Sequence, residues 1–289
     1  PSELATVRRI QIAAKQRVLD LFHGAYKSAF KGRGIEVEDI REYIQGDDIR
    51  AMSWSRTATM GKPYVKTFRE ERDLTVTLMV DISASLNFGS HFHTKRERLA
   101  EIGALLAFSA IYNHDKVSLL LFSDRVERYI PAKRGDKHGM CIIRELLSYK
   151  PVGRQTNIAD ALHFLQHVQS KRAIVFLLSD FLSPSWERDF MLAEKKEDLV
   201  AIRIQDPVEK KMPAVGLVFA RDLETGVCRM IDIDQKTIDT MTEEDQKNSK
   251  HFHSIVESVG ANYIDITTDS PYEDALLAFF KKRKRKLVR

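Results

Sequence analysis

The residues best suited to binding or catalysis lie in VTLMVDISAS. In this segment Asp81 ends an apolar run, and the hydroxyl residues Ser83 and Ser85 follow it. The apolar run predicts a buried strand. In an open α/β sheet, ligands bind outside the carboxyl ends of the strands. A carboxylate and two hydroxyls at such an end therefore indicate a binding site rather than packing. A third hydroxyl residue, Ser90, comes a little later in the chain.

Two other segments place oxygen-bearing side chains at comparable positions. Asp180 ends the apolar run in LLSDF, and Thr156 lies at a loop-to-helix junction in GRQTNIADAL. If the sheet is parallel, the strands end at one edge and these side chains can meet there. They offer only hard oxygen ligands, which suit Mg²⁺ or Mn²⁺. The predicted metal ligands are Asp81, Ser83, Ser85, Thr156 and Asp180.

Each of these residues also has a simpler explanation when it is taken alone. Thr156 or Asn157 could cap the helix that follows, and Asp81 could close a turn. Their combination in this order favours a site. A zinc protease is not indicated, because His163 and His167 in HFLQH lack the Glu of H-E-x-x-H.

Regular alternation of strands and helices begins after Asp73. Strands are predicted at 74–80, 117–122, 173–179, 199–205 and 262–266, and helices at 95–113, 137–149, 157–170, 185–197, 235–258 and 271–286. This order predicts an α/β fold, a doubly wound and mostly parallel Rossmann-like sheet with helices on both faces. The segments GLVFARD and VCRMIDI, joined by LETG, predict a hairpin at one edge.

The first part of the chain has a different character. An amphipathic helix is predicted over 3–26. Strands are predicted in IEVEDIREYI and PYVKTF, and the turn residues QGDD lie between them. We therefore expect a small helix and β attachment over 1–72 and a main domain over 73–289.

Composition and charge exclude several classes of protein. The 289 residues are 43% hydrophobic and 30% charged, as in a soluble globular protein. Cys141 and Cys228 form no CxxC pattern, so neither a disulfide framework nor a zinc site is indicated. The longest apolar stretch, 102–112, is too short to span a bilayer, and the N-terminus lacks a signal-peptide core, so a cytoplasmic location is expected.

The net charge of +5 is concentrated in the tail KKRKRKLVR, which holds seven cations, and the rest of the chain carries −2. We expect the tail to be a solvated helix end without specific affinity for nucleic acid.

These motifs resemble a known domain. DISAS, Thr156 and Asp180 look like the metal-ion-dependent adhesion site of the von Willebrand factor type A domain, and the element order from 73 to 285 is similar to that fold. The stretch before it, 32–71, resembles the bacterial family called domain of unknown function fifty-eight. That match is strongest at Arg41, Glu42, Tyr43, Gly46, Asp47, Asp48, Arg50 and Trp54. Whether this segment braces the attachment or binds a partner is left open.

The resemblance implies that Ser83, Ser85 and Thr156 place hydroxyls on the metal, with Asp81 and Asp180 bound directly or through waters. Leu86 stands where many members have Met. The resemblance also implies a partner, a MoxR-type AAA+ ATPase, and a role as an adaptor or chaperone-like module.

We therefore expect a non-enzymatic interaction module without catalytic residues, in which the bound cation attracts an acidic side chain of a partner. A Mg²⁺-dependent phosphatase-like hydrolase is the main alternative, but it needs a second carboxylate where Ser83 stands. The chain also lacks a G-x-x-x-x-G-K-[ST] phosphate loop. RNA binding, found in some proteins with A-type domains, is opposed by the near-neutral body.

Overall fold

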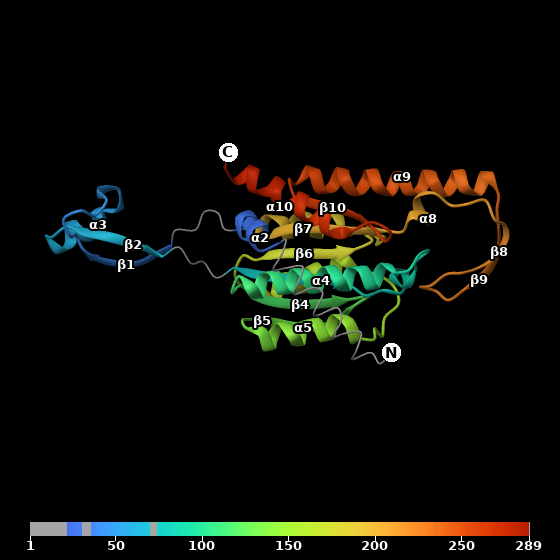
Figure 1. Ribbon diagram of the computed structural model, residues 1–289, viewed down its shortest axis with the longest axis horizontal. Coiled ribbons are helices and arrows are strands. Elements are labelled where there is room, and N and C mark those ends of the chain that lie inside the picture. The colour runs from blue at the N-terminus through green and yellow to red at the C-terminus, as the bar shows by residue number, and fades with distance from the viewer. Residues whose placement is uncertain (1–21, 31–35, 70–73, 289) are drawn as a thin grey trace.

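A six-stranded sheet forms the centre of the protein, in a computed structural model that describes residues 22–30, 36–69 and 74–288 (Figure 1). Its strands are β3 (Thr75–Asp81), β4 (Lys116–Phe122), β5 (Val126–Lys133), β6 (Ile174–Ser179), β7 (Asp198–Gln205) and β10 (Asn262–Thr267). They lie in the order β10-β7-β6-β3-β4-β5, and all neighbours are parallel except β4 and β5. The predicted α/β fold with a mostly parallel sheet is confirmed.

Helices cover both faces of this sheet. One face carries α2 (His23–Phe30), α4 (Lys95–Tyr112), α5 (Asp136–Ser148) and α10 (Tyr272–Val288); the other carries α6 (Ile158–Val168), α7 (Glu187–Lys196) and α9 (Gln235–Ser258). Successive residues of a strand point to opposite faces of the sheet. Leu78 and Val80 therefore pack against the helices of the first face, and Met79 packs against those of the second. The strands read as continuous apolar runs because both sides are buried.

Strand β5 was not predicted from the sequence. It runs antiparallel to β4 at the edge of the sheet, and Ile130 is its only buried residue. The segment VERYIPAK therefore lacks the apolar run that marks the central strands. Its Pro131 cannot donate a backbone hydrogen bond, and an edge strand tolerates this.

The predicted hairpin is present as β8 (Gly216–Arg221) and β9 (Cys228–Ile233), but its expected place at an edge of the main sheet is wrong. The two strands form a sheet of their own, inserted between α8 (Pro207–Lys210) and α9. Alternating residues identify a strand without saying which other strand it pairs with, and here each strand pairs only with the other.

A second two-stranded sheet pairs β1 (Glu36–Glu42) with β2 (Tyr64–Arg69), around η2 (Ile49–Ala51) and α3 (Trp54–Met60). The Arg41 guanidinium donates to both carboxylate oxygens of Asp47, at 2.8 and 2.7 Å. Asp47 also accepts from the Ile44 backbone N–H, and Asp48 caps η2. Gly46 has a φ of 111°, which favours glycine. The acidic pair in REYIQGDDIR therefore forms a turn, as one of the two interpretations supposed.

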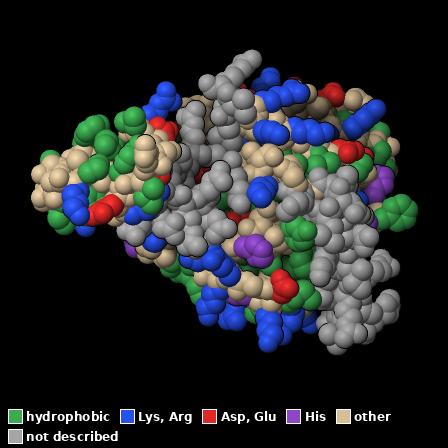
Figure 2. Space-filling view, turned by 60° about the vertical axis from the view of Figure 1, so that its left-hand side comes forward, with side chains coloured by type: hydrophobic (Ala, Val, Ile, Leu, Met, Phe, Trp, Pro, Cys, Tyr) green, Lys and Arg blue, Asp and Glu red, His purple; other side chains and the backbone are tan. Residues whose placement is uncertain are grey.

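Trp54 does not brace this unit, because its side chain is 68% exposed. Figure 2 shows hydrophobic side chains spread over the small unit, and Ile44, Ile49 and Met60 are also large and exposed.

Helix α2 packs into the main core although it precedes the boundary expected at residue 72. The predicted helix over 3–26 lies mostly outside the described residues. Phe22, Tyr26 and Phe30 each place a ring within 6 Å of Phe280 in α10. The Tyr26 hydroxyl also donates to Asp115 at 3.1 Å.

The basic tail continues α10, and one of its cations has a structural role. The Arg283 guanidinium stacks 4.5 Å from the Phe30 ring centre, donates to the Ala29 carbonyl at 3.1 Å and pairs with Asp198. Lys281, Lys282, Lys284 and Arg285 are exposed, as expected of a solvated helix end.

Replacing Phe280 by alanine should lower the free energy of unfolding by about 3–5 kcal/mol, because a fully buried ring leaves a cavity among four other rings. Urea denaturation followed by circular dichroism measures this. The matched control is Phe92→Ala, since the Phe92 side chain is 97% exposed and its loss should change stability by less than about 0.5 kcal/mol. Equal losses in the two variants would contradict the packing of α2 and α10.

Candidate metal site at the carboxyl edge of the sheet

The ends of β3 and β6 bring the two predicted carboxylates together. These strands are parallel neighbours, with Val80 opposite Leu178, so Asp81 and Asp180 emerge at one edge. Both side chains are buried, with relative exposures of 0% and 4% for the two residues. The prediction that the two strands lie in one sheet and end at the same edge is confirmed.

Asp81 is held by short contacts from both sides. Its Oδ1 accepts from the Ser83 backbone N–H at 2.8 Å, and its Oδ2 accepts from the Ser179 hydroxyl at 2.6 Å. Burial, and then the negative charge of Asp180, raise the pKa of Asp81 to about 7. Asp81 thus closes a turn and also leaves a carboxylate in a place where its charge is poorly solvated.

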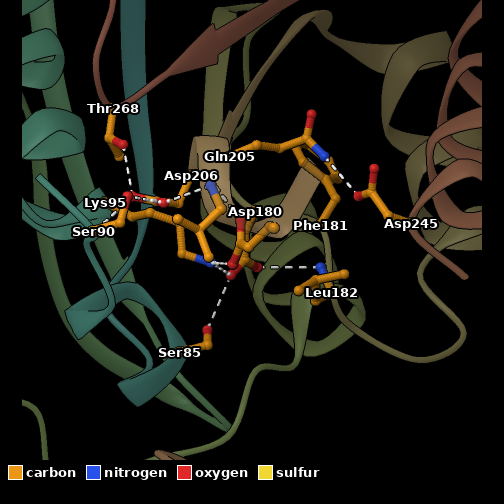
Figure 3. Close-up of polar contacts among 12 residues, drawn as sticks. Ser85, Ser90, Lys95, Asp180, Phe181, Leu182, Gln205, Asp206, Asp245 and Thr268 are labelled. Atoms are coloured by element: carbon orange, nitrogen blue, oxygen red, sulfur yellow. Dashed lines mark hydrogen bonds and ion pairs between the residues drawn. The ribbon is translucent and has the colours of Figure 1, made fainter. Parts of the chain in front are cut away.

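A chain of hydroxyls links the first loop to Asp180. The Ser83 and Ser85 hydroxyl oxygens lie 3.1 Å apart, and Ser85 donates to Asp180 Oδ2 at 3.1 Å. Asp180 Oδ1 accepts from the Leu182 backbone N–H at 3.2 Å. Figure 3 shows Ser85 and Leu182 approaching Asp180 from two different loops. The structure therefore gathers four of the five predicted ligands into one contiguous cluster.

The loop that carries Thr156 is fastened to both neighbouring loops. The Ala84 N–H donates to the Arg154 carbonyl at 2.8 Å, and the Ser183 hydroxyl donates to the Thr156 carbonyl at 3.2 Å. These contacts place Thr156 beside the residues that follow β3 and β6. All five predicted ligands thus belong to three loops that contact one another.

The capping role falls to Asn157, so Thr156 is left for another purpose. The Asn157 side chain accepts from the Asp160 backbone N–H at 3.0 Å at the start of α6. The Thr156 hydroxyl oxygen is buried, and among the residues that the structure describes it has no hydrogen-bond partner. A buried polar group without a partner costs free energy and calls for an explanation, such as an ion that it binds.

Lys95 is a further member of the site that the sequence did not single out. Its ammonium lies 2.9 Å from Asp180 Oδ2 and 2.7 Å from Glu209 Oε1, and its side chain is 1% exposed. Burial lowers the pKa of Lys95, but the charges of Asp180 and Glu209 outweigh this and raise it. The sequence does contain one indication of this role. Lys95 directly follows Thr94, which caps α4, and a helix dipole disfavours a cation at this end of a helix, so a lysine here needs an anionic partner.

Ser90, the third hydroxyl residue after β3, is directed elsewhere. Its backbone N–H donates to Asp206 Oδ2 at 2.9 Å, and its hydroxyl donates to Asp206 as well. Thr268 donates to the same carboxylate at 2.8 Å (Figure 3). Asp206 thereby ties the loop after β3 to the ends of β7 and β10, and Ser90 belongs to this support rather than to the metal ligands.

The residues fit a hard divalent cation. Two buried carboxylates and three hydroxyls, one of them without a partner, form the set of oxygens that Mg²⁺ accepts. Over 22–30, 36–69 and 74–288 there is no group of three or more His, Cys, Asp or Glu suited to a metal, and the predicted set relies on hydroxyls instead. His163 and His167 are exposed on α6, where His167 contacts the His163 carbonyl.

We expect Asp81→Asn to stabilise the metal-free protein at pH 8 while leaving it little changed near pH 4. The raised pKa means that ionising Asp81 costs folding stability as pH rises from about 4, the ordinary value, to about 7. The pKa shift limits the gain in the free energy of unfolding to about 4 kcal/mol. The altered hydrogen bond to Ser179 should make the gain smaller. Thermal unfolding in EDTA across this range measures it, with Asp232→Asn on β9 as the exposed control. Parallel pH profiles for wild type and Asp81→Asn would contradict the prediction.

Several solved structures are similar to this chain in fold. An aerotolerance-related membrane protein from Bacteroides fragilis NCTC 9343, with multiple mutations to serines, has a TM-score of 0.50 at 14% identity, over 74% of this chain and 99% of that one. BatB from Bacteroides thetaiotaomicron has a TM-score of 0.47 at 15% identity, over 73% of this chain and 99% of that one. The SpRpn10 VWA domain has a TM-score of 0.41 at 13% identity, over 72% of this chain and 94% of that one. At these identities the likeness concerns the fold alone.

Curated relatives extend over nearly the whole sequence. The uncharacterised protein Rv1480 of Mycobacterium tuberculosis is 27% identical over 288 residues, covering 99% of this chain and 91% of its own. The uncharacterised protein Mb1516 of Mycobacterium bovis gives the same figures.

Among the described residues, no helix combines the length and apolar character that crossing a bilayer demands.

One family model covers most of the upstream stretch and most of the sheet domain. This model, described as Protein of unknown function DUF58, matches residues 39–251, which is most of the chain. It therefore confirms the family that the sequence resembled, and the protein belongs to the DUF58 family.

Proposed function

We propose that this protein is a non-enzymatic interaction module that binds Mg²⁺ or Mn²⁺ at the sheet edge and uses it to bind a carboxylate of a protein partner. Asp81, Ser83, Ser85, Thr156 and Asp180 would hold the cation. The observation that carries the proposal is the buried Thr156 hydroxyl, which lacks a partner beside two buried carboxylates.

The charges of the site explain why a partner's carboxylate is needed. Three of the five ligands are neutral hydroxyls, and Lys95 already shares the charge of Asp180. A cation bound here supplies a strong positive field that the chain's own ligands neutralise incompletely. An acidic side chain from outside would complete the neutralisation, so partner binding and metal binding would support each other.

The rim of the site favours a protein as the partner. Phe92, Val152 and Leu182 have relative exposures of 97%, 76% and 50%, and each lies on one of the loops that hold the predicted ligands. Exposed apolar side chains around a charged centre are typical of protein interfaces. The partner surface that fits is an Asp or Glu with apolar neighbours.

The family resemblance directs the proposal to a MoxR-type AAA+ ATPase in the bacterial cytoplasm, with this chain as its adaptor or chaperone-like partner. The hydrolase alternative has no support from the geometry. Ser83, where a second catalytic carboxylate would stand, is buried and hydrogen-bonded to Ser85. RNA binding is not favoured either, because the chain outside the basic tail carries a net charge of −2.

Thr156→Val should abolish Mg²⁺ binding without destabilising the metal-free protein, since its hydroxyl makes no hydrogen bond that the change could break. The matched control is Thr77→Val, a fully buried threonine whose hydroxyl bonds to Ser118 at 2.8 Å. That change should cost about 1–3 kcal/mol and leave Mg²⁺ affinity intact. Calorimetric titration with Mg²⁺ and thermal unfolding in EDTA measure the two properties. Unchanged Mg²⁺ binding by Thr156→Val would remove the site from this position.

Chelation should weaken the complex with a MoxR-type ATPase at least tenfold, because the partner's carboxylate would lose its cation. Phe92→Ala should weaken it severalfold even with Mg²⁺ present, since its exposed ring contributes contact area. Surface plasmon resonance with a MoxR-type ATPase from the same organism, in Mg²⁺ and in EDTA, provides the measurement. Affinity that is indifferent to EDTA would refute the metal-dependent mechanism, and turnover of a phosphate ester by the isolated chain would favour the hydrolase.

A further inference from the structure

The loop that carries Thr156 has no regular secondary structure of its own. It connects α5, which ends at Ser148, with α6, which begins at Ile158. The backbone donors of such a loop need acceptors from other parts of the chain, and the position of its side chains depends on those acceptors. Whatever fixes this loop therefore also fixes the Thr156 hydroxyl at the sheet edge.

Glu127, on the edge strand β5, provides an acceptor for this loop. Its Oε1 accepts from the backbone N–H groups of Val152 and Gly153, at 3.0 and 2.7 Å, and from the Ser123 hydroxyl at 2.8 Å. The Tyr149 hydroxyl, at the start of the loop, donates to Glu127 Oε2 at 3.3 Å. Hydrogen bonds to a charged acceptor are stronger than those between neutral groups. One carboxylate thus joins β5 to the start and the middle of the loop.

Gly153 shows how closely the loop approaches the turn between β4 and β5. A Cβ atom placed on Gly153 would lie 2.2 Å from Ser123 Oγ and 2.3 Å from Asp124 Oδ1, both in that turn. On the other side of Thr156, the Asn157 backbone N–H donates to the Ser123 carbonyl at 2.8 Å. The backbone on both sides of Thr156 is therefore held against this turn and the strand that follows it.

We propose that Glu127 is a positioning residue of the metal site, which holds the loop 149–157 so that the Thr156 hydroxyl stays among the other predicted ligands. The inference rests on the proposed function, because it takes Mg²⁺ or Mn²⁺ to bind at the sheet edge. Within the part of the chain that the structure describes, none of the side-chain hydrogen bonds of Glu127 reaches a predicted ligand. Glu127 acts through the loop backbone, so its shape matters more to the site than its charge.

Three substitutions at this one position separate shape from charge. Glu127→Gln removes the charge but keeps an oxygen that can accept from Val152 and Gly153. Glu127→Asp keeps the charge but is one methylene shorter, and Glu127→Ala lacks the acceptor altogether. With Mg²⁺ alone as the ligand in calorimetry, Glu127→Ala should raise the Kd at least about tenfold and Glu127→Asp severalfold, whereas Glu127→Gln should stay within about threefold of wild type.

The matched control is Glu194→Ala. Glu194 is also half-buried and also accepts a backbone N–H, from Leu199 at 2.8 Å, but this bond lies at the amino end of β7, away from the metal site. Its loss should change the Kd for Mg²⁺ by about twofold at most.

Amide hydrogen exchange at Val152 and Gly153 gives a second readout that needs no metal. It should become faster in Glu127→Asp and Glu127→Ala, because their N–H groups lose the acceptor. It should stay slow in Glu127→Gln and in Glu194→Ala. A general loss of stability would instead speed exchange throughout the sheet domain.

The outcomes distinguish this inference from the proposed function. Unchanged Mg²⁺ affinity in Glu127→Ala would overturn the inference and leave the metal site standing. Lost affinity in Glu127→Gln with retained affinity in Glu127→Asp would also overturn it, because Glu127 would then act through its charge. If Glu127→Ala does not fold, these two variants decide by themselves. If wild type binds neither Mg²⁺ nor Mn²⁺, the proposed function fails and the role of Glu127 fails with it.

Discussion

Two carboxylates buried side by side impose the main constraint on this structure. Asp81 and Asp180 end adjacent parallel strands and have almost no contact with water. Like charges in such a place repel each other, and the structure must either neutralise them or keep a proton on one of them. The raised pKa of Asp81 favours the second solution. A divalent cation would provide the first.

Much of the surrounding structure offsets this repulsion. Ser179 and the Ser83 backbone donate to Asp81, and Lys95 donates to Asp180. Asp206 binds the loop after β3 to the ends of two other strands through Ser90 and Thr268. These supports hold the ligand loops in place without the cation. A bound cation would therefore not be needed to keep these loops in place, which suits the reversible binding that we propose.

The sequence predicted the fold and the candidate ligands because both depend on local patterns. The central strands are buried on two sides and so appear as apolar runs, and the ligands follow two of these runs directly. Lys95 escaped prediction for the opposite reason, since it reaches the site only through packing of distant elements. It stands at the start of a helix, where no periodic signal points to the sheet edge. The edge strand β5 was missed because it lacks an apolar run.

The choice of ligands also bears on how the site would respond to a partner. Hydroxyls bind a cation weakly and leave its charge exposed, whereas a cage of carboxylates would bind it tightly and present little charge outside. A site of the first kind gains most when one more carboxylate arrives. In the proposed function, a partner that supplies this carboxylate would also cover exposed apolar side chains on the ligand loops, such as Phe92, Val152 and Leu182. Affinity would then depend on two surfaces together, an acidic side chain and an apolar one, and an isolated carboxylate in solution would compete poorly for the site.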